Sequence, residues 1–353
     1  MSYSTPFIGF HTRFADHDSV DGLLKLVDQG LAPAGINALI LEFNPGYSYR
    51  CFPEYSTGTI TYEDCEKIRD FCAQRGIKAF PLFQCLSHQS DHMVSAKAWP
   101  LLRAHPEFCE TPDVPEDAKW PDFYVHSWCP SNDGIYEYVF PMMDELIEAF
   151  RTDVLHIGVD EVFEIAEACC PRCAGKDKAV LLADTVKRIH DHLAARGVET
   201  MMWGDRLLNA DKLGYQMWEA DRFGMYPAFD MADKVTRDII ITDWHYDLHD
   251  HGYPSIGQFM EGGFRTIAAL GADEEQAAHF LKFCLEYVYL GRKYGWKGNF
   301  DGVLFTHWAP LTNEKADDLL EGLKGGERSQ FPYSSRNVGR TITKCMKNLQ
   351  GRL

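Results

Sequence analysis

The sequence predicts a single (β/α)8 barrel, and three observations support this prediction. Eight apolar runs of strand length are spread over the 353 residues. Amphipathic segments of helical length alternate with them. Most of the apolar runs are hydrophobic at consecutive positions, as expected of parallel strands that are buried on both faces. Eight strand-then-helix units in a chain of this length favour a closed barrel with extra loops over an open sheet.

The eight expected strands are short apolar runs that end in polar residues, prolines or turn signals. In chain order they are FIGFHTRF from Phe7, NALILEFN from Asn37, KAFPLFQCL from Lys78, VLHIGVDEV from Val154, ETMMWGDRLL from Glu199, DIIITDWHYD from Asp238, RTIAAL from Arg265 and DGVLFTHWAP from Asp301.

Four segments between the expected strands have a clear helical pattern. Three of them end in Arg-Gly or Tyr-Gly, and glycine is the stop signal expected just past a helix. The long irregular stretch from about residue 88 to residue 133 predicts a loop insertion after the third strand, of a kind that usually carries function. No repeat or linker interrupts the pattern, so residues 1–353 are predicted to form one domain. The four segments are TYEDCEKIRDFCAQRG from Thr61, GIYEYVFPMMDELIEAF from Gly134, KDKAVLLADTVKRIHDHLAARG from Lys176 and DEEQAAHFLKFCLEYVYLGRKYG from Asp273.

The charge balance argues against nucleic acid or an anionic membrane as a partner. Lysine and arginine number 35 against 52 acidic residues, which gives a net charge of −17. No run approaches the roughly 18 apolar residues of a membrane span, and the N-terminus does not resemble a secretion signal. Eleven irregularly spaced cysteines favour reduced thiols and a cytoplasmic location, although a processed, exported form stays open. The oligomeric state is also open.

Unusual polar and aromatic residues gather at the ends of the expected strands. The carboxyl ends of the strands build the active site in a barrel of this type. A ring of indoles around two acids suits a sugar, because aromatic faces pack on the apolar side of a pyranose and carboxylates perform the bond chemistry. These residues are His11, Arg13, His88, Asp160, Glu161, Trp203, Asp205, Trp244, Tyr246, His307 and Trp308.

Asp160 and Glu161 are neighbours, which restricts the mechanism. Neighbouring residues on a strand face opposite ways, so both can reach one site only if the strand ends or twists there. The usual pair of glycosidase carboxylates is roughly 5 Å or more apart. Adjacent acids better suit a substrate that carries its own nucleophile, such as a 2-acetamido group. The charge of Asp160 is then expected to help keep Glu161 protonated as the acid.

The segment HIGVDE resembles the His-x-Gly-Gly-Asp-Glu signature of glycoside hydrolase family 20, the β-N-acetylhexosaminidases, and differs only at Val159. PLFQCLSH keeps Pro81 and His88 of that family's Pro-Glu-x-Asp-x-Pro-Gly-His. TDWHYD resembles the segment whose tyrosine binds the acetamido group, here Tyr246. GVLFTHW resembles the segment whose tryptophan walls the sugar site, here Trp308. The accessory domain that usually precedes the barrel is not expected.

The resemblance implies a role for each candidate residue. Glu161 is the expected general acid and base, Asp160 orients the acetamido group, and Tyr246 donates a hydrogen bond to it. No cofactor is implied for catalysis. Core packing is the alternative for each tryptophan, and pairing with a buried acid such as Glu42 is the alternative for Arg13. The expected substrate-binding residues are Arg13, His88, Trp203, Trp218, Trp244 and Trp308.

The predicted function is an exo-acting, retaining β-N-acetylhexosaminidase that works through an oxazolinium intermediate on an amino-sugar glycoside. Gln84, Val159 and Pro310 depart from the family pattern, where aspartate, glycine and a sugar-binding glutamate are expected. They leave open a sugar-binding protein without catalysis, or a glycosidase of altered specificity. The gluco or galacto epimer, a sulfated or phosphorylated sugar, and the natural polymer stay open too. A metal-dependent hydrolase ranks last, because FHTRF lacks a His-x-His pair.

A separate motif, CCPRCAGK from Cys169, resembles half of a zinc knuckle. Four ligands are needed, and the loop after the third strand offers Cys109 and Cys129. The sequence therefore predicts a structural zinc held by Cys109, Cys129, Cys170 and Cys173, with Cys169 as a substitute. Ordinary reduced thiols are the alternative. Such a metal would join loops and take no part in catalysis.

Overall fold

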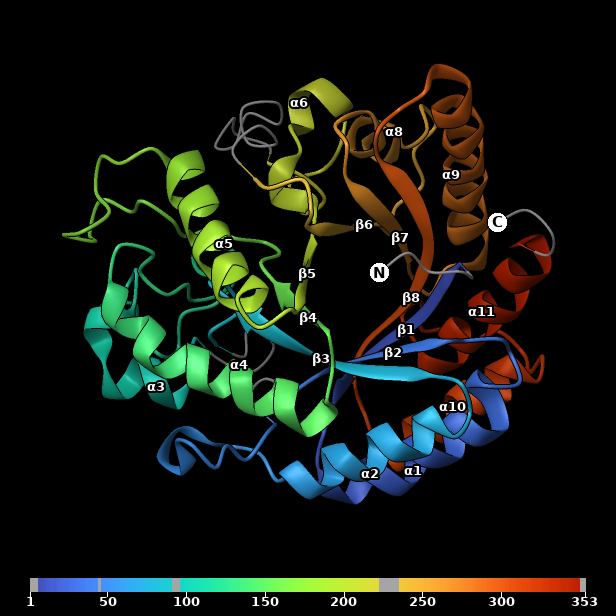
Figure 1. Ribbon diagram of the computed structural model, residues 1–353, viewed down its shortest axis with the longest axis horizontal. Helices are drawn as coiled ribbons and strands as arrows, with labels where there is room; N and C mark the ends of the chain where they lie inside the picture. The colour runs from blue at the N-terminus through green and yellow to red at the C-terminus, as the bar shows by residue number, and fades with distance from the viewer. Residues whose placement is uncertain (1–5, 44–45, 91–95, 222–234, 350–353) are drawn as a thin grey trace. The chain divides into compact units, whose positions relative to one another are not determined.

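The protein's structure, a computed structural model, describes residues 6–43, 46–90, 96–221 and 235–349. Its strands form a closed barrel in sequence order (Figure 1). The predicted (β/α)8 barrel is therefore confirmed, and all eight expected runs form its strands. These are β1 Phe7–Phe14, β2 Ala38–Glu42, β3 Lys78–Cys85, β4 Val154–Gly158, β5 Glu199–Trp203, β6 Ile240–His245, β7 Arg265–Leu270 and β8 Asn299–Leu311.

Internal contacts divide the chain into two compact units. Unit 1 is Met1–Gly46, Thr59–Leu82 and Ile240–Leu353, and unit 2 is Tyr47–Gly58 and Phe83–Ile239. The prediction of one domain stays a prediction. Among the described residues, the structure contains no helix with the length and hydrophobicity that a membrane span requires.

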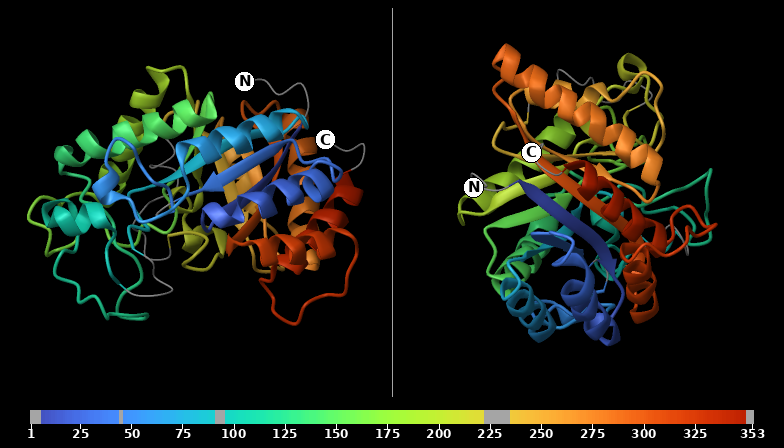
Figure 2. Two further views of the ribbon diagram at one scale, coloured as in Figure 1. Left: turned by 90° about the horizontal axis from the view of Figure 1, so that it is seen from below. Right: turned by 90° about the vertical axis from the view of Figure 1, so that its right-hand side faces the viewer.

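Unit 1 contains the pairs β1–β2, β6–β7, β7–β8 and β8–β1, all parallel, and most residues of its strands are buried. Helix α11 lies against both α9 and α10, and α1 lies against α10 (Figure 2). A Cβ at Gly322 would lie 2.0 Å from the carbonyl oxygen of Arg336, so glycine permits α10 and α11 to approach closely. The helices are α1 Val20–Leu26, α2 Tyr62–Ala73, α8 Pro254–Glu261, α9 Glu274–Tyr294, α10 Asn313–Leu323 and α11 Ser335–Leu349.

Unit 2 contains the parallel pair β4–β5 and two long helices. The ring of Phe140 in α4 stacks on His192 in α5 at 3.8 Å, and Asp144 in α4 accepts a hydrogen bond from the same histidine at 2.8 Å. The predicted insertion after β3 is confirmed: its described residues, 86–90 and 96–135, hold short helical segments and isolated bridges. Among its described residues, the helices of this unit are α3 Pro100–Ala104, α4 Tyr136–Phe150, α5 Lys178–Ala194 and α6 Ala210–Leu213.

The glycines predicted to stop three helices do so. Gly76 follows α2, Gly197 follows α5 and Gly295 follows α9, with φ of 71°, 71° and 66°. Helix α2 begins with a capping box, in which the Thr61 side chain accepts from the N–H of Asp64 and the Asp64 side chain accepts from that of Thr61. Local sequence therefore sets these helix boundaries.

Acid is expected to destabilise unit 1 through His307 in β8. Its ring nitrogens lie 2.9 Å from the hydroxyls of Thr12 and Ser335. Burial, together with the charges of Lys315 and His11, lowers the pKa of His307 from 6.5 to about 3. The unfolded chain binds this proton more readily, so stability is expected to fall by on the order of a few kcal/mol as the pH drops from 6.5 towards 3.

Thermal unfolding of wild type and His307→Gln, measured from neutral pH downwards, tests this expectation. The variant is expected to have a lower midpoint at neutral pH but a shallower loss with acid. The exposed His251, changed to Gln, is the control and should retain the wild-type slope. An equally steep slope in His307→Gln would contradict the assignment.

Candidate active site

The neighbouring acids Asp160 and Glu161 follow β4 and face one histidine. Three residues here have positive φ, namely Gly158 at 67°, Val159 at 69° and Glu161 at 48°. This left-handed path breaks the alternation that would turn the two side chains apart. His88 Nε2 lies 3.5 Å from Asp160 Oδ2 and 3.3 Å from Glu161 Oε2. The two carboxylates therefore share one site in unit 2.

Gln84, at the end of β3, positions Asp160. Its Nε2 donates a hydrogen bond to Asp160 Oδ1 at 2.7 Å, and the Ser87 hydroxyl donates to the backbone carbonyl of Asp160. This hydrogen bond fixes the orientation of the carboxylate. Gln84 also lies against Gly158, where a Cβ would be 2.1 Å from Gln84 Oε1. Residue 158 must therefore be glycine for two reasons, its positive φ and this close approach.

Glu161 is held by its backbone and its side chain. Its N–H donates to Asp205 Oδ2 at 2.9 Å, and the hydroxyl of Tyr124 donates to Glu161 Oε2 at 2.8 Å. Asp205 is buried and pairs with Arg206 Nε at 2.7 Å. Arg206 also donates to the carbonyl of Trp218 at 2.9 Å. One buried ion pair thus connects the catalytic candidate to the loop that carries a predicted sugar-binding tryptophan.

The pKa of Glu161 lies below its ordinary value of 4.5. Burial raises this pKa, but the hydrogen bond and charge of His88, the hydrogen bond from Tyr124 and the charge of Arg206 together outweigh burial. The expectation that Asp160 keeps Glu161 protonated is therefore wrong for the free protein. The reason is that His88, Tyr124 and Arg206, which come from other segments of the chain, surround Glu161.

An aromatic cluster surrounds Tyr124 beside the acid. The ring of Trp218 lies 5.2 Å from Tyr124, 5.2 Å from Trp120 and 5.5 Å from Phe163, measured between centroids. Trp120 is 56% exposed, so the cluster reaches the surface. Trp218 is therefore close to Glu161, as a sugar-binding role requires. Sequence reasoning missed Trp120, Tyr124 and Phe163, although the aromatic stretch KWPDFY within the insertion was a usable signal.

Trp203 has a different environment from Trp218. Its side chain, at the end of β5, is fully buried, and its ring lies 4.5 Å from that of His156. The structure shows core packing for Trp203, which was the alternative considered for each tryptophan. A sugar contact for Trp203 stays a prediction, and it would require the surrounding side chains to move.

Tyr246, just after β6 in unit 1, lies in a chain of hydrogen bonds. The indole N–H of Trp308 donates to the Tyr246 hydroxyl at 2.8 Å. That hydroxyl lies 2.9 Å from Thr306 Oγ1, which is 3.0 Å from the Leu270 carbonyl. Because an indole N–H only donates and a carbonyl only accepts, the Tyr246 hydroxyl accepts from Trp308, and the Leu270 carbonyl accepts from Thr306. The mostly buried Trp244 stacks on Tyr246 at 5.2 Å.

Arg13 lies beside an acid at the end of β2. Its Nε is 3.8 Å from Glu42 Oε1, and His11 Nε2 is 3.2 Å from Glu42 Oε2. The His11 ring also lies 4.8 Å from that of Trp308. The alternative considered for Arg13, pairing with Glu42, is thus present. A contact between Arg13 and the sugar stays a prediction.

The predicted cysteine set needs one correction. The thiols of Cys129, Cys170 and Cys173 converge, but Cys109 is not with them, and its sulfur lies 3.5 Å from His126 Nδ1. The carboxylate of Glu110 joins the three thiols instead. Because successive side chains of an extended segment face opposite ways, Cys109 turns away from the three thiols when Glu110 faces them.

Residues 39–271, more than half of the chain, match the catalytic domain of glycosyl hydrolase family 20. The chain belongs to glycosyl hydrolase family 20. A β-hexosaminidase of Vibrio furnissii is 24% identical over 245 residues, which cover 67% of this chain and 35% of that protein. The chain thus spans about a third of the length of this curated relative. The family predicted from the sequence is therefore confirmed.

Solved structures of family 20 enzymes share the fold. A β-N-acetylhexosaminidase structure has a TM-score of 0.64 and 16% identity, with 99% of this chain and 76% of that one covered. The chitobiase of Flavobacterium johnsoniae has a TM-score of 0.62 and 17% identity, with 98% and 51% covered. Likeness at these identities concerns the barrel alone.

Two departures from the family 20 pattern have structural counterparts. Val159 replaces a glycine at a position with φ of 69°, where a β-branched residue costs about 1–3 kcal/mol. Its complete burial offsets part of this cost. Pro310 replaces a sugar-binding glutamate, and its carbonyl accepts a hydrogen bond from Lys315 Nζ at 2.9 Å. An ammonium group therefore lies close to the backbone of residue 310.

Removing the Tyr124 hydroxyl is expected to raise the pKa of Glu161. The phenol donates to the ionised carboxylate and so lowers this pKa, and Tyr124→Phe loses that stabilisation. The alkaline side of the pH profile of kcat/KM, where the pair of Glu161 and His88 loses its proton, is expected to move to higher pH. Tyr55→Phe is the matched control, because Tyr55 bonds to His105 instead. A shift to lower pH in Tyr124→Phe, or an equal shift in the control, would contradict this reasoning.

Proposed function

We propose that the protein is an exo-acting, retaining β-N-acetylhexosaminidase that removes terminal N-acetylglucosamine or N-acetylgalactosamine. The strongest support is the grouping of Asp160 and Glu161 around His88. One oxygen of each carboxylate and one ring nitrogen lie within 4.8 Å of one another. Inverting glycosidases need about 6.5–9.5 Å between their carboxyl groups to admit water. Acids this close suit a substrate whose own amide oxygen attacks.

In the proposed reaction, Glu161 protonates the glycosidic oxygen while the acetamido oxygen attacks the anomeric carbon. The bond to the leaving group breaks, a bond between the amide oxygen and the anomeric carbon forms, and a cyclic oxazolinium ion results. Asp160 accepts a hydrogen bond from the amide N–H and stabilises the positive charge. Water then opens the ring with Glu161 as base, which restores the original configuration. The resemblance to family 20 makes Tyr246 the expected donor to the amide oxygen, and the proposed reaction needs no cofactor.

His88 has a defined place in this proposal. Glu161 has a lowered pKa in the free protein, so a proton must reach it before it acts as an acid. His88 Nε2 lies 3.3 Å from Glu161 Oε2 and can hold that proton. We therefore treat His88 and Glu161 as a pair that shares one proton, and its pH dependence belongs to the pair.

Two other functions have some support. A sugar-binding protein without catalysis is favoured by the departures at Gln84 and Pro310. A metal-dependent hydrolase is favoured by the three ligand atoms that His88, Asp160 and Glu161 offer within 4.8 Å. Against the second, both carboxylates already accept hydrogen bonds, Asp160 from the amide of Gln84 and Glu161 from Tyr124.

A panel of chromogenic substrates separates these functions. We expect turnover of 4-nitrophenyl N-acetyl-β-glucosaminide or galactosaminide, and at least about 100-fold less for the β-glucoside that lacks the acetamido group. A thiazoline mimic of the oxazolinium ion is expected to inhibit tightly, and EDTA is expected to leave the rate unchanged. Binding without turnover would identify the sugar-binding protein. Loss of activity in EDTA, restored by Mg²⁺ or Mn²⁺, which suit carboxylates rather than a thiolate site, would identify the metal-dependent enzyme.

A further inference from the structure

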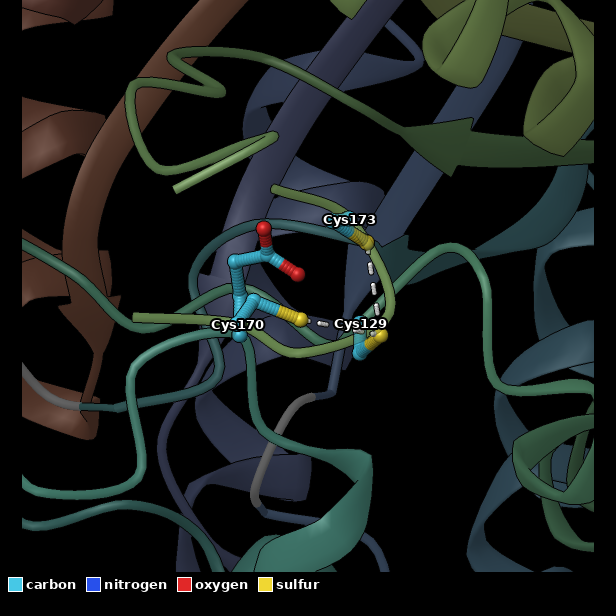
Figure 3. Close-up of side chains that lie close together, drawn as sticks. Cys129, Cys170 and Cys173 are labelled. Carbon is cyan, nitrogen blue, oxygen red and sulfur yellow. Dashed lines mark hydrogen bonds between the residues drawn. The ribbon is translucent and has the colours of Figure 1, made fainter. Parts of the chain in front are cut away.

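Three buried thiols from two separate loops meet in unit 2 (Figure 3). Cys129 comes from the insertion after β3, and Cys170 and Cys173 come from the loop after β4. Cys129 Sγ lies 3.5 Å from Cys170 Sγ and 3.4 Å from Cys173 Sγ. Each of the three residues is at most 1% exposed. The group lies apart from the acids Asp160 and Glu161 along the chain, and the proposed reaction does not use it.

The sulfur distances fit a metal site better than a disulfide. A disulfide holds its sulfurs about 2.05 Å apart, and all cysteines of the chain are free. Thiolates bound tetrahedrally to zinc, with bonds of about 2.3 Å, lie about 3.8 Å apart. The observed 3.4 Å and 3.5 Å are close to that spacing. A small outward movement of each sulfur would admit the ion.

Glu110 supplies a fourth donor. Its carboxylate is fully buried and has an oxygen within 4.8 Å of the ligand atoms of all three cysteines. Oε1 accepts a hydrogen bond from the N–H of Glu167 at 2.9 Å. For Oε2, no hydrogen-bond partner is present among the described residues. A buried carboxylate oxygen in this position is costly unless a cation pairs with it.

The local backbone prepares this arrangement. Cys109 and Trp128 form an antiparallel bridge. Glu110 follows Cys109 and Cys129 follows Trp128, so the bridge brings the segments that carry these two ligands side by side. The Cys170-Pro171-Arg172-Cys173 turn closes with hydrogen bonds from the N–H groups of Cys173 and Ala174 to the carbonyl of Cys170. Two thiols two residues apart on such a turn are the spacing used in structural zinc sites.

We propose that Cys129, Cys170, Cys173 and Glu110 form a structural zinc site. Three thiolates favour zinc over harder divalent cations, and four protein donors in a buried position leave no open coordination site for a reaction. The ion would fasten the insertion that carries Tyr124 to the loop that carries Glu161. This inference does not depend on the proposed glycosidase activity.

Metal analysis of the full-length protein is the first test. The protein is purified without chelators and without a polyhistidine tag, and about one equivalent of zinc per chain is expected. Replacement by Co²⁺ is expected to give intense thiolate-to-cobalt absorption and the visible bands of a tetrahedral site. X-ray absorption of the zinc form is expected to show sulfur neighbours at about 2.3 Å. Absence of zinc, with no cobalt spectrum after Co²⁺ is added to the reduced protein, would overturn the proposal.

Paired cysteine variants give the second test. Cys129→Ser is expected to lower the bound zinc at least about tenfold, while Cys109→Ser, a neighbouring buried thiol outside the set, retains it. Glu110→Gln is expected to weaken zinc binding while the protein stays folded. This variant therefore tests the ligand set even if Cys129→Ser does not fold. Equal zinc content in Cys129→Ser and Cys109→Ser would refute the ligand set. A disulfide between Cys129 and Cys170 or Cys173 in protein isolated without oxidant would refute it as well.

Discussion

Glu161→Gln is expected to lower kcat/KM about 10²–10⁴-fold for substrates with poor leaving groups, the range that one general acid contributes. Glutamine retains the size of the side chain and can still bond to Tyr124, but it cannot transfer a proton. Leaving groups such as 4-nitrophenolate depart without protonation, so the loss for them is expected to be much smaller. The dependence of the rate on leaving-group pKa should therefore become steeper in the variant.

The measurement compares a series of aryl N-acetyl-β-glucosaminides with wild type, Glu161→Gln and Glu164→Gln. Glu164 is a strict control, because it is three residues away in the same loop. Burial raises its pKa to about 7, which would also suit an acid. Its carboxylate, however, accepts a hydrogen bond from Thr111, and the proposal gives it no role. Loss of activity on poor leaving groups in Glu164→Gln alone would transfer the acid role to Glu164.

Asp160→Asn is expected to lower kcat/KM about 10²–10³-fold for every leaving group, as removal of one preorganised electrostatic partner does in other enzymes. Asp160 acts on the sugar's amide, so its loss affects formation of the oxazolinium ion itself, whatever group departs. The variant also places an asparagine against Gln84, which further disturbs the orientation of residue 160.

The diagnostic result is the contrast between the two variants. A plot of rate against leaving-group pKa is expected to keep its wild-type slope in Asp160→Asn, at a lower level, and to become steeper in Glu161→Gln. Asp211→Asn, at an exposed aspartate of the same unit, controls for the loss of a surface charge. Equal slopes in both active-site variants would show that the two acids do not divide the work as proposed. Unchanged activity in Asp160→Asn would remove the substrate-assisted mechanism.

Periodicity and local signals predicted the architecture well. Eight apolar runs became eight barrel strands, and the glycines at 76, 197 and 295 ended their helices. These features depend on interactions within a few residues, on burial of consecutive apolar side chains and on the ease with which glycine adopts positive φ. Strand ends were less well predicted, since β5 stops at Trp203 while its apolar run continues to Leu208.

The site was predicted in part. Asp160, Glu161 and His88 were expected together and lie together, because one short motif and the ends of two strands carry them. Tyr124 was missed, since it lies in the long insertion, where no periodicity indicates which side chain turns inward. The expectation that Glu161 is protonated in the free protein was wrong, because the groups that lower its pKa, His88, Tyr124 and Arg206, come from other segments of the chain.

By itself, the sequence determined the barrel, its helix boundaries and the pair of acids after the fourth strand, because each of these leaves a signal within a short stretch of the chain: an apolar run, a glycine stop or a short motif. Only the tertiary structure decided which groups surround those acids and that Glu110, rather than Cys109, faces the three thiols. Both depend on how distant loops meet, and in an extended segment a shift of one residue exchanges a thiol for a carboxylate.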